Sequence, residues 1–136
     1  MVSVTSGVGI YLGSGGSVTN EAGASISATR GAISVQGGVL TRTNNGSIQT
    51  TGAYAAISTD TGAIITNGTA GHITSARTGI SLSNTIGTID NKGTIVSTAT
   101  SSATAGVAIY LGNGGLITNE AVALIKANRS AISIAK

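Results

Sequence analysis

The 136-residue chain contains no cysteine, proline, tryptophan or phenylalanine, and three tyrosines are its whole aromatic content. The absence of cysteine excludes a disulfide scaffold, a thiolate metal site and a cysteine nucleophile. The absence of proline, together with the lack of a three-residue glycine period, excludes a collagen-like chain. No run of about 18 apolar residues is present, so no segment is expected to cross a bilayer as a helix.

Charged residues are scarce as well. Seven Lys and Arg against four Asp and Glu give a net charge of +3, and charged residues make up 8% of the chain. This density is too low for the basic surface that nucleic acids require. We therefore expect no nucleic-acid partner.

The chain has few side chains suited to catalysis. Its single histidine is His72, and its acids are Glu21, Asp60, Asp90 and Glu120. In the repeat described below, His72, Asp60 and Asp90 fall on different sides, and Glu21 and Glu120 occupy equivalent sites four rungs apart. Neither a Ser-His-Asp triad nor a pair of neighbouring carboxylates is therefore expected. We predict a protein that is not an enzyme and that holds no metal and no cofactor.

Small residues and aliphatics dominate what is present. Glycine (21), alanine (19), threonine (20) and serine (17) make up more than half of the chain, and isoleucine, valine and leucine add 32 residues. The aliphatic content is too high for a disordered linker. With so few bulky side chains, a core has to be built by a regular backbone that brings aliphatics to one interior, which points to internal repeats.

Three columns of aliphatic residues recur with a period of about 24 residues. The first begins an apolar–polar–apolar alternation, typical of a β-strand, at each member. It consists of Ile10, Ile33, Ile57, Ile80, Ile109 and Ile132. The second consists of Val18, Leu40, Ile65, Ile89 and Ile117. The third consists of Ile26, Ile48, Ile73, Ile95 and Ile125.

These columns predict an all-β protein, a parallel β-helix (β-solenoid) with about 24 residues and three short strands per turn. We call one turn a rung, and we expect five full rungs plus a partial one in a single domain over residues 1–136. Stacked rungs lie about 4.8 Å apart, so equivalent positions form columns of like residues. The longer step between Ile80 and Ile109 predicts an outer-corner loop near 97–105.

A column of asparagines follows the second aliphatic column by two residues, at Asn20, Asn67, Asn91 and Asn119. In the second rung Arg42 occupies the position given by simple alignment, so Asn44 or Asn45 is the expected equivalent. Stacked amides can form a hydrogen-bonded ladder. The alternative is a set of separate asparagines in surface turns.

A second polar column lies three residues before each isoleucine of the first aliphatic column. It contains Gly7, Arg30, Tyr54, Arg77, Gly106 and Arg129. Guanidinium groups stack on tyrosine rings and bind sulfate, carboxylate or phosphate. Arg30, Tyr54, Arg77 and Arg129 are therefore the candidate ligand-binding residues, with acidic glycans as the ligand. The alternative is a corner whose charges only keep the protein soluble.

A longer repeat indicates that the chain is a segment of a larger array. Residues 7–34 match residues 106–133 at 19 of 28 positions. Such similarity is typical of duplication, and it predicts that both end rungs are interior rungs of a longer protein. Exposed rung edges are also templates for end-to-end self-association.

The motif Ile89-Asp-Asn91-Lys-Gly93-Thr-Ile95 resembles the I-x-N-x-G-x-I signature of bacterial autotransporter passenger domains and filamentous adhesins. Looser copies are Val18-Thr-Asn20, Ile65-Thr-Asn67 and Ile117-Thr-Asn119. The resemblance implies a right-handed parallel β-helix that is secreted or displayed at a Gram-negative outer membrane. It implies roles in adhesion, aggregation or virulence, with host surface molecules as partners. The start of the chain, MVSVTSGVG, does not resemble a secretion signal, and no strand has the aromatic girdles of a translocator barrel.

Four functions are compatible with these observations. An adhesin-type passenger segment is the first, and a purely structural spacer or fibre-forming solenoid is the second. Ice binding is the third, because Thr41-Arg-Thr43 and Thr59-Asp-Thr61 have the T-x-T spacing that aligns hydroxyls on a flat face. These pairs do not recur in one column, however, and Thr59 is expected to point inward. The fourth is a polysaccharide-binding remnant of a β-helix enzyme.

Overall fold

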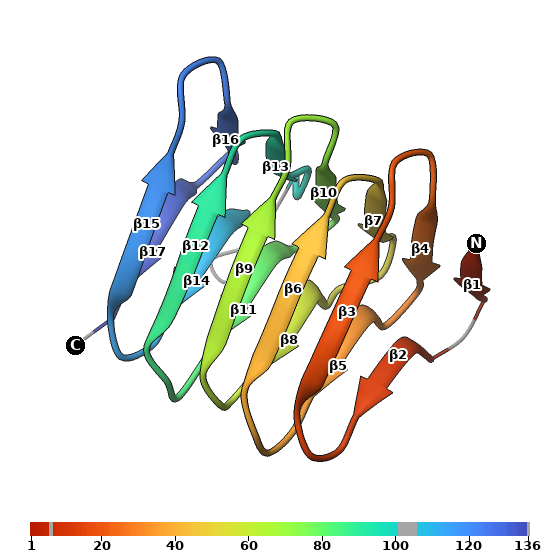
Figure 1. The fold of residues 1–136 in the computed structure, drawn as a ribbon. Coiled ribbons are helices and arrows are strands. Elements are labelled where there is room, and N and C mark those ends of the chain that lie inside the picture. The colour runs from red at the N-terminus through yellow and green to blue at the C-terminus, as the bar shows by residue number, and fades with distance from the viewer. Residues whose placement is uncertain (6, 101–105, 136) are drawn as a thin grey trace.

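Short strands wind the chain into a β-solenoid of about five turns. The computed structural model describes residues 1–5, 7–100 and 106–135. Within these ranges every strand belongs to one of three parallel sheets, and the strands of each sheet follow one another from the N-terminal end to the C-terminal end of the rod (Figure 1). This architecture confirms the predicted parallel β-helix with a period of about 24 residues.

We name the sheets A, B and C. Sheet A contains β1 (Val2–Val4), β4 (Ser25–Ala28), β7 (Ser47–Thr50), β10 (His72–Ser75), β13 (Thr94–Ser97) and β16 (Leu124–Lys126). Sheet B contains β2 (Val8–Leu12), β5 (Gly31–Val35), β8 (Ala55–Thr59), β11 (Thr78–Leu82), β14 (Val107–Leu111) and β17 (Ser130–Ile134). Sheet C contains β3 (Gly16–Asn20), β6 (Leu40–Asn44), β9 (Ala63–Asn67), β12 (Gly87–Asn91) and β15 (Gly115–Asn119).

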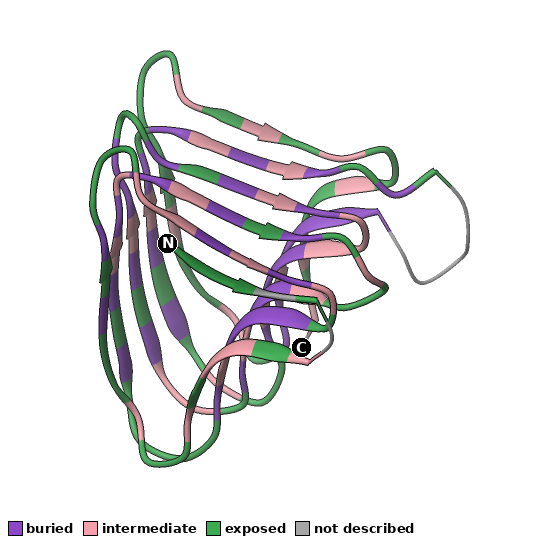
Figure 2. Ribbon diagram, turned by 90° about the vertical axis from the view of Figure 1, so that its right-hand side faces the viewer, coloured by how far each residue is buried: buried purple, intermediate pink, exposed green. Residues whose placement is uncertain are grey.

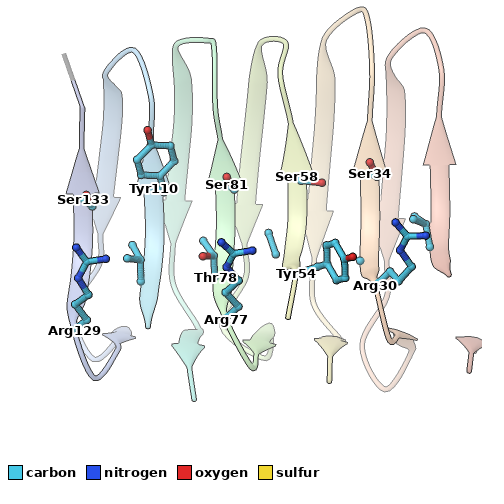
Figure 3. A pocket seen from close by; sticks show the side chains of 14 residues that line it. Arg30, Ser34, Tyr54, Ser58, Arg77, Thr78, Ser81, Tyr110, Arg129 and Ser133 are labelled. Atoms are coloured by element: carbon cyan, nitrogen blue, oxygen red, sulfur yellow. The ribbon is translucent and has the colours of Figure 1, made fainter. Parts of the chain in front are cut away.

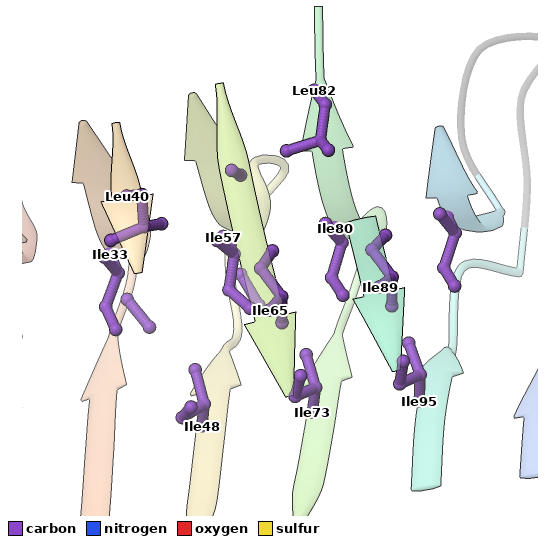
Figure 4. Close-up of a cluster of buried hydrophobic side chains, with 14 of the residues drawn as sticks. Ile33, Leu40, Ile48, Ile57, Ile65, Ile73, Ile80, Leu82, Ile89 and Ile95 are labelled. Carbon is purple, nitrogen blue, oxygen red and sulfur yellow. The ribbon is translucent and has the colours of Figure 1, made fainter. Parts of the chain in front are cut away.

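The core consists of stacked isoleucines. In sheet B the register pairs Ile33 with Ile57 and Ile57 with Ile80, and all three side chains are fully buried. Isoleucines of sheets A and C reach the same interior from the other two sides (Figure 4). Buried and more exposed residues alternate along the strands (Figure 2), because successive side chains of a strand point to opposite faces.

The second aliphatic column was predicted incorrectly in one rung. Its member in β6 is Arg42, which pairs with Val18 on one side and Ile65 on the other. Leu40 instead pairs with Gly16 and Ala63, two residues earlier in the strand. Because residues i and i+2 of a strand share a face, both Leu40 and Arg42 point inward. Leu40 thus stands where the neighbouring rungs have the smaller Gly16 and Ala63.

Arg42 is consequently enclosed in an apolar interior. Its side chain is 1% exposed, and among the described residues no hydrogen-bond partner reaches its Nε, Nη1 or Nη2. Burial removes the hydration of the guanidinium and lowers the pKa of Arg42 to about 9. The group therefore still carries its charge at neutral pH, without a partner.

A ladder of asparagine amides runs along one corner of the solenoid. Each Nδ2 donates to the Oδ1 of the next rung, over 2.8 Å from Asn20 to Asn44, 2.8 Å from Asn44 to Asn67, and 2.8 Å from Asn67 to Asn91. The last bond, from Asn91 to Asn119, is 2.7 Å. Asn44, and not Asn45, is the member in the second rung. The bonds all run in one direction. Each asparagine donates to the next one toward the C-terminal end, so the Oδ1 of Asn20 and the Nδ2 of Asn119 take no part in the ladder.

Glycines beside the ladder are required by close approach of the backbone. A Cβ on Gly71 would lie 2.3 Å from Oδ1 of Asn67 and 2.4 Å from the backbone oxygen of Asn44. The same crowding by neighbouring rungs occurs at Gly46 and Gly93. The I-x-N-x-G-x-I pattern thus has a packing reason in this chain, because the buried asparagine amide leaves no room for a side chain at the glycine.

The predicted outer-corner loop falls between β13 and β14. Its residues 101–105 lie outside the described part of the chain. In the part that is described, no helix could span a membrane.

Candidate functional site

A groove of about 630 Å³ runs across the outer face of sheet B, from β2 to β17 (Figure 3). Three columns of residues line it. The first precedes the strands and contains Arg30, Tyr54, Arg77 and Arg129. The second opens the strands and contains Val8, Gly31, Ala55, Thr78 and Val107. The third lies at the fourth strand position and contains Ser34, Ser58, Ser81, Tyr110 and Ser133.

The strand alternation explains why these side chains face outward. In β8, Ile57 points into the core, and Ser58 beside it points to the groove. In-register parallel pairing then aligns Ser58 with Ser34 and Ser81 in the neighbouring strands. A line of serine hydroxyl groups results, in which Tyr110 takes the place of a serine in β14 (Figure 3).

The arginine column is held in place by local contacts. The guanidinium of Arg30 lies 5.2 Å from the centre of the Tyr54 ring, in cation–π geometry. Arg77 donates from Nη1 to the backbone oxygen of Ala53 over 3.1 Å. Tyr54 remains 46% exposed. The four candidate ligand-binding residues predicted from the sequence therefore line one groove, and Arg30 and Arg77 have a defined position in it.

Along sheet B, from β5 to β17, an arginine precedes every second strand. Arg30 precedes β5, Arg77 precedes β11 and Arg129 precedes β17. Gly106 stands at the intervening position before β14, with a φ of +86°. A Cβ there would lie 3.3 Å from the Cβ of Arg129 and in a strained backbone conformation, so a side chain is disfavoured at Gly106.

The groove is electropositive. No acidic residue is present among the described residues that line it. Asp90 lies in sheet C, where its Oδ2 is 3.3 Å from Nζ of Lys92. Glu21 and Glu120 directly follow β3 and β15, also of sheet C. The three arginines of the groove thus lie at another sheet than Asp90, Glu21 and Glu120, which favours an anionic ligand over the sheet B face.

The residues considered for catalysis lie apart. His72 is exposed at the start of β10 in sheet A, and Asp90 belongs to sheet C. Asp60 follows β8 of sheet B, at the turn toward sheet C. Among the described residues, no group of three or more His, Cys, Asp and Glu could hold a metal ion.

The two T-x-T pairs lie on different sheets. Thr41 and Thr43 lie in β6 of sheet C. Thr59 ends β8 of sheet B and is 3% exposed, and its hydroxyl group is hydrogen-bonded to the hydroxyl group of Thr61 over 3.0 Å. These two pairs therefore do not form one flat array of hydroxyls.

Sequence reasoning identified the arginine column but did not combine it with the serines into one groove. The signal is present in the sequence, because each of Ser34, Ser58, Ser81 and Ser133 follows a member of the arginine column by four residues. No protein-family model, curated protein sequence or solved structure matches the chain. The family resemblance therefore rests on the repeat motifs of the sequence.

Proposed function

We propose that this chain is a non-enzymatic, adhesin-type β-solenoid segment that binds acidic polysaccharide in the groove on sheet B. The observation that carries the proposal is a groove lined by three arginines, two tyrosines and a line of serines, with no acid among the described lining residues. Arginine forms strong charge-assisted hydrogen bonds to carboxylate and sulfate. The sequence resemblance to autotransporter passengers and filamentous adhesins supports a location outside the cell or at its surface.

Binding of heparin, as a general polyanionic glycan, tests this proposal. Replacing Arg77 by alanine is expected to weaken the affinity about tenfold, because a hydrogen bond to a charged group contributes about 1.5 kcal/mol or more. The measurement is a titration by calorimetry or fluorescence at fixed ionic strength.

A matched control removes the same charge elsewhere. Lys126 lies in β16 of sheet A and is exposed, so Lys126→Ala lowers the net charge equally without touching the groove. Its affinity is expected to stay within about twofold of the original, since Lys126 does not line the groove and salt screens the charge of an exposed side chain. Equal losses in both variants would mean that net charge, and not the groove, binds the polyanion.

End-to-end self-association is the second candidate function, and the direction of the asparagine ladder favours it. Within the chain Asn20 donates into the ladder and Asn119 accepts from it, so a continued ladder would have the Nδ2 of Asn119 donate to the Oδ1 of Asn20 in the next copy. A second copy stacked head to tail would continue the ladder and cover the exposed side chains of β17, of which Ile132 is 42% and Ile134 is 58% exposed. Head-to-tail interfaces that do not close produce filaments.

Sedimentation against protein concentration tests self-association. The double variant Ile132→Lys and Ile134→Lys is expected to remain monomeric where the original chain forms larger species, because lysine on a sheet edge opposes pairing. Ile64→Lys is the control, since Ile64 is 51% exposed on the outer face of sheet C and away from the rung edges. A monomeric original chain at all concentrations would contradict this second function.

A further inference from the structure

We infer that the ligand of the sheet B groove is a linear polysaccharide with one anionic group per disaccharide, lying parallel to the solenoid axis. The inference rests on the proposed function and names its ligand class. It follows from the spacing of the cations, from what stands between them, and from the line of hydroxyl groups opposite.

The spacing of the cations comes from the strand order. Arg30, Arg77 and Arg129 precede β5, β11 and β17, which are two strands apart in sheet B. Since neighbouring strands lie about 4.8 Å apart, successive arginines recur about every 10 Å along the axis. An extended disaccharide is of similar length, so the anions of a chain that is charged on alternate sugars recur at the same interval as the arginines.

The positions between the arginines carry no charge. Tyr54 stands between Arg30 and Arg77, and Gly106 stands between Arg77 and Arg129. A polymer with an anion on every sugar would bring its intermediate anions next to the Tyr54 ring and Gly106. Desolvating a charge without a partner is unfavourable. The groove therefore selects against the denser polymer as well as for the sparser one.

The hydroxyl groups recur at the shorter interval. Ser34, Ser58 and Ser81 lie on consecutive strands, about 4.8 Å apart. That interval corresponds to a single sugar of an extended chain, so one serine is available to each sugar and one arginine to every second sugar. Tyr110 replaces the serine in β14, the strand that follows Gly106. At that rung the ligand meets the ring of Tyr110 on one side, and Gly106 offers it no side chain on the other.

The test compares three kinds of oligosaccharide with equal numbers of sugars. Hyaluronan fragments carry one carboxylate per disaccharide, oligogalacturonates carry one per sugar, and dextran fragments carry none. We expect hyaluronan fragments to bind about tenfold more tightly than oligogalacturonates, and dextran fragments to bind most weakly. Affinity for hyaluronan is expected to rise up to the hexasaccharide, whose three carboxylates match the three arginines, and then to level off.

Tyr54 offers a variant that changes the spacing. Tyr54→Arg places cations on three consecutive strands, and it is expected to raise the affinity for oligogalacturonates more than the affinity for hyaluronan fragments. Tyr54→Phe keeps the ring beside Arg30 and is expected to leave the ratio of the two affinities unchanged. Circular dichroism of both variants checks that the strands are intact.

The outcomes separate the inference from the function on which it rests. Binding of oligogalacturonates as tight as that of hyaluronan, or a Tyr54→Arg ratio equal to that of the original chain, would overturn the spacing inference and leave the proposed function in place. Absence of binding to heparin and to both acidic oligosaccharides would overturn the proposed function. If Tyr54→Arg does not fold, the comparison of the three oligosaccharides on the unmodified chain decides the matter.

Discussion

Replacing Arg42 by isoleucine is expected to raise the free energy of unfolding by about 1 to 4 kcal/mol at pH 7. The guanidinium is 1% exposed and has no hydrogen-bond partner among the described residues. An isolated charge in such a place loses its hydration without compensation. Isoleucine would continue the column between Val18 and Ile65 and remove that loss. Urea unfolding followed by circular dichroism measures the difference.

The same substitution is expected to remove a dependence of stability on pH. Burial lowers the pKa of Arg42 to about 9 in the folded chain, well below the value of an unfolded arginine. Below pH 9 the group is protonated in both states, so its unfavourable contribution is constant. Above it, the unfolded chain keeps the proton that the folded chain releases, and stability therefore rises with pH. As the pH is raised above about 9, the free energy of unfolding of the original chain should therefore rise toward that of the Arg42→Ile variant.

Arg30→Ile provides the control for charge. Arg30 is exposed, so its replacement removes the same unit charge from the surface and is expected to change the free energy of unfolding by about 0.5 kcal/mol or less. An Arg42→Ile variant that is no more stable than Arg30→Ile would contradict a buried, unpaired guanidinium.

Replacing Asn67 by alanine is expected to lower the free energy of unfolding by about 3 to 4 kcal/mol. Asn67 is fully buried and accepts from Asn44 while donating to Asn91, both over 2.8 Å. Its Nδ2 also donates to the backbone oxygens of Gly71 and Thr94, over 3.1 and 3.2 Å. Alanine at this position leaves several buried polar groups without their partner, and each unsatisfied group costs about 1 kcal/mol or more.

Asn119→Ala is the matched control at the end of the same ladder. Asn119 is exposed, and its side chain accepts from Asn91 and donates to the backbone oxygen of Ala123. Water can replace these partners, so the expected loss is about 1 kcal/mol. Thermal and urea unfolding of both variants give the comparison. Equal losses would show that the interior of the ladder contributes no more than its solvated end.

The two substitutions concern two kinds of buried polar side chain in one solenoid, one with hydrogen-bond partners and one without. The interior asparagines of the ladder, such as Asn67, are buried with partners in the rung above, the rung below and the adjacent backbone. Arg42 is buried with none of these among the described residues. Stability of a solenoid is a sum over rungs and their interfaces, so both effects should originate in the rungs that contain the substituted residue.

Much of the fold could be predicted because a solenoid converts sequence spacing directly into contacts. Isoleucines about 24 residues apart become neighbours across parallel strands, as Ile33, Ile57 and Ile80 do. The same rule predicted that Arg30, Tyr54 and Arg77 would share a line. The stacking of Arg30 on Tyr54 follows from that line, since the two side chains precede adjacent strands.

The second rung could not be predicted from hydrophobicity. A leucine and an arginine stand two residues apart in β6, and the pattern favoured Leu40 as the member of the aliphatic column. Pairing along the whole strand decides otherwise, because it aligns Asn44 with Asn20 and Asn67 and thereby places Arg42 between Val18 and Ile65. The cooperative gain of an uninterrupted ladder and sheet outweighs the unfavourable burial of one guanidinium.

The sequence by itself determined the period, the three sheets and the columns of residues, because identical rungs stack in register. The tertiary structure alone decided the position of Arg42 in the interior and the joining of the arginine and serine columns into one groove. The physical reason is that spacing along the chain specifies which residues share a column. Which columns face each other across a surface, and what each side chain finds beside it, depends on how the strands pair and on the shape of the turns between them.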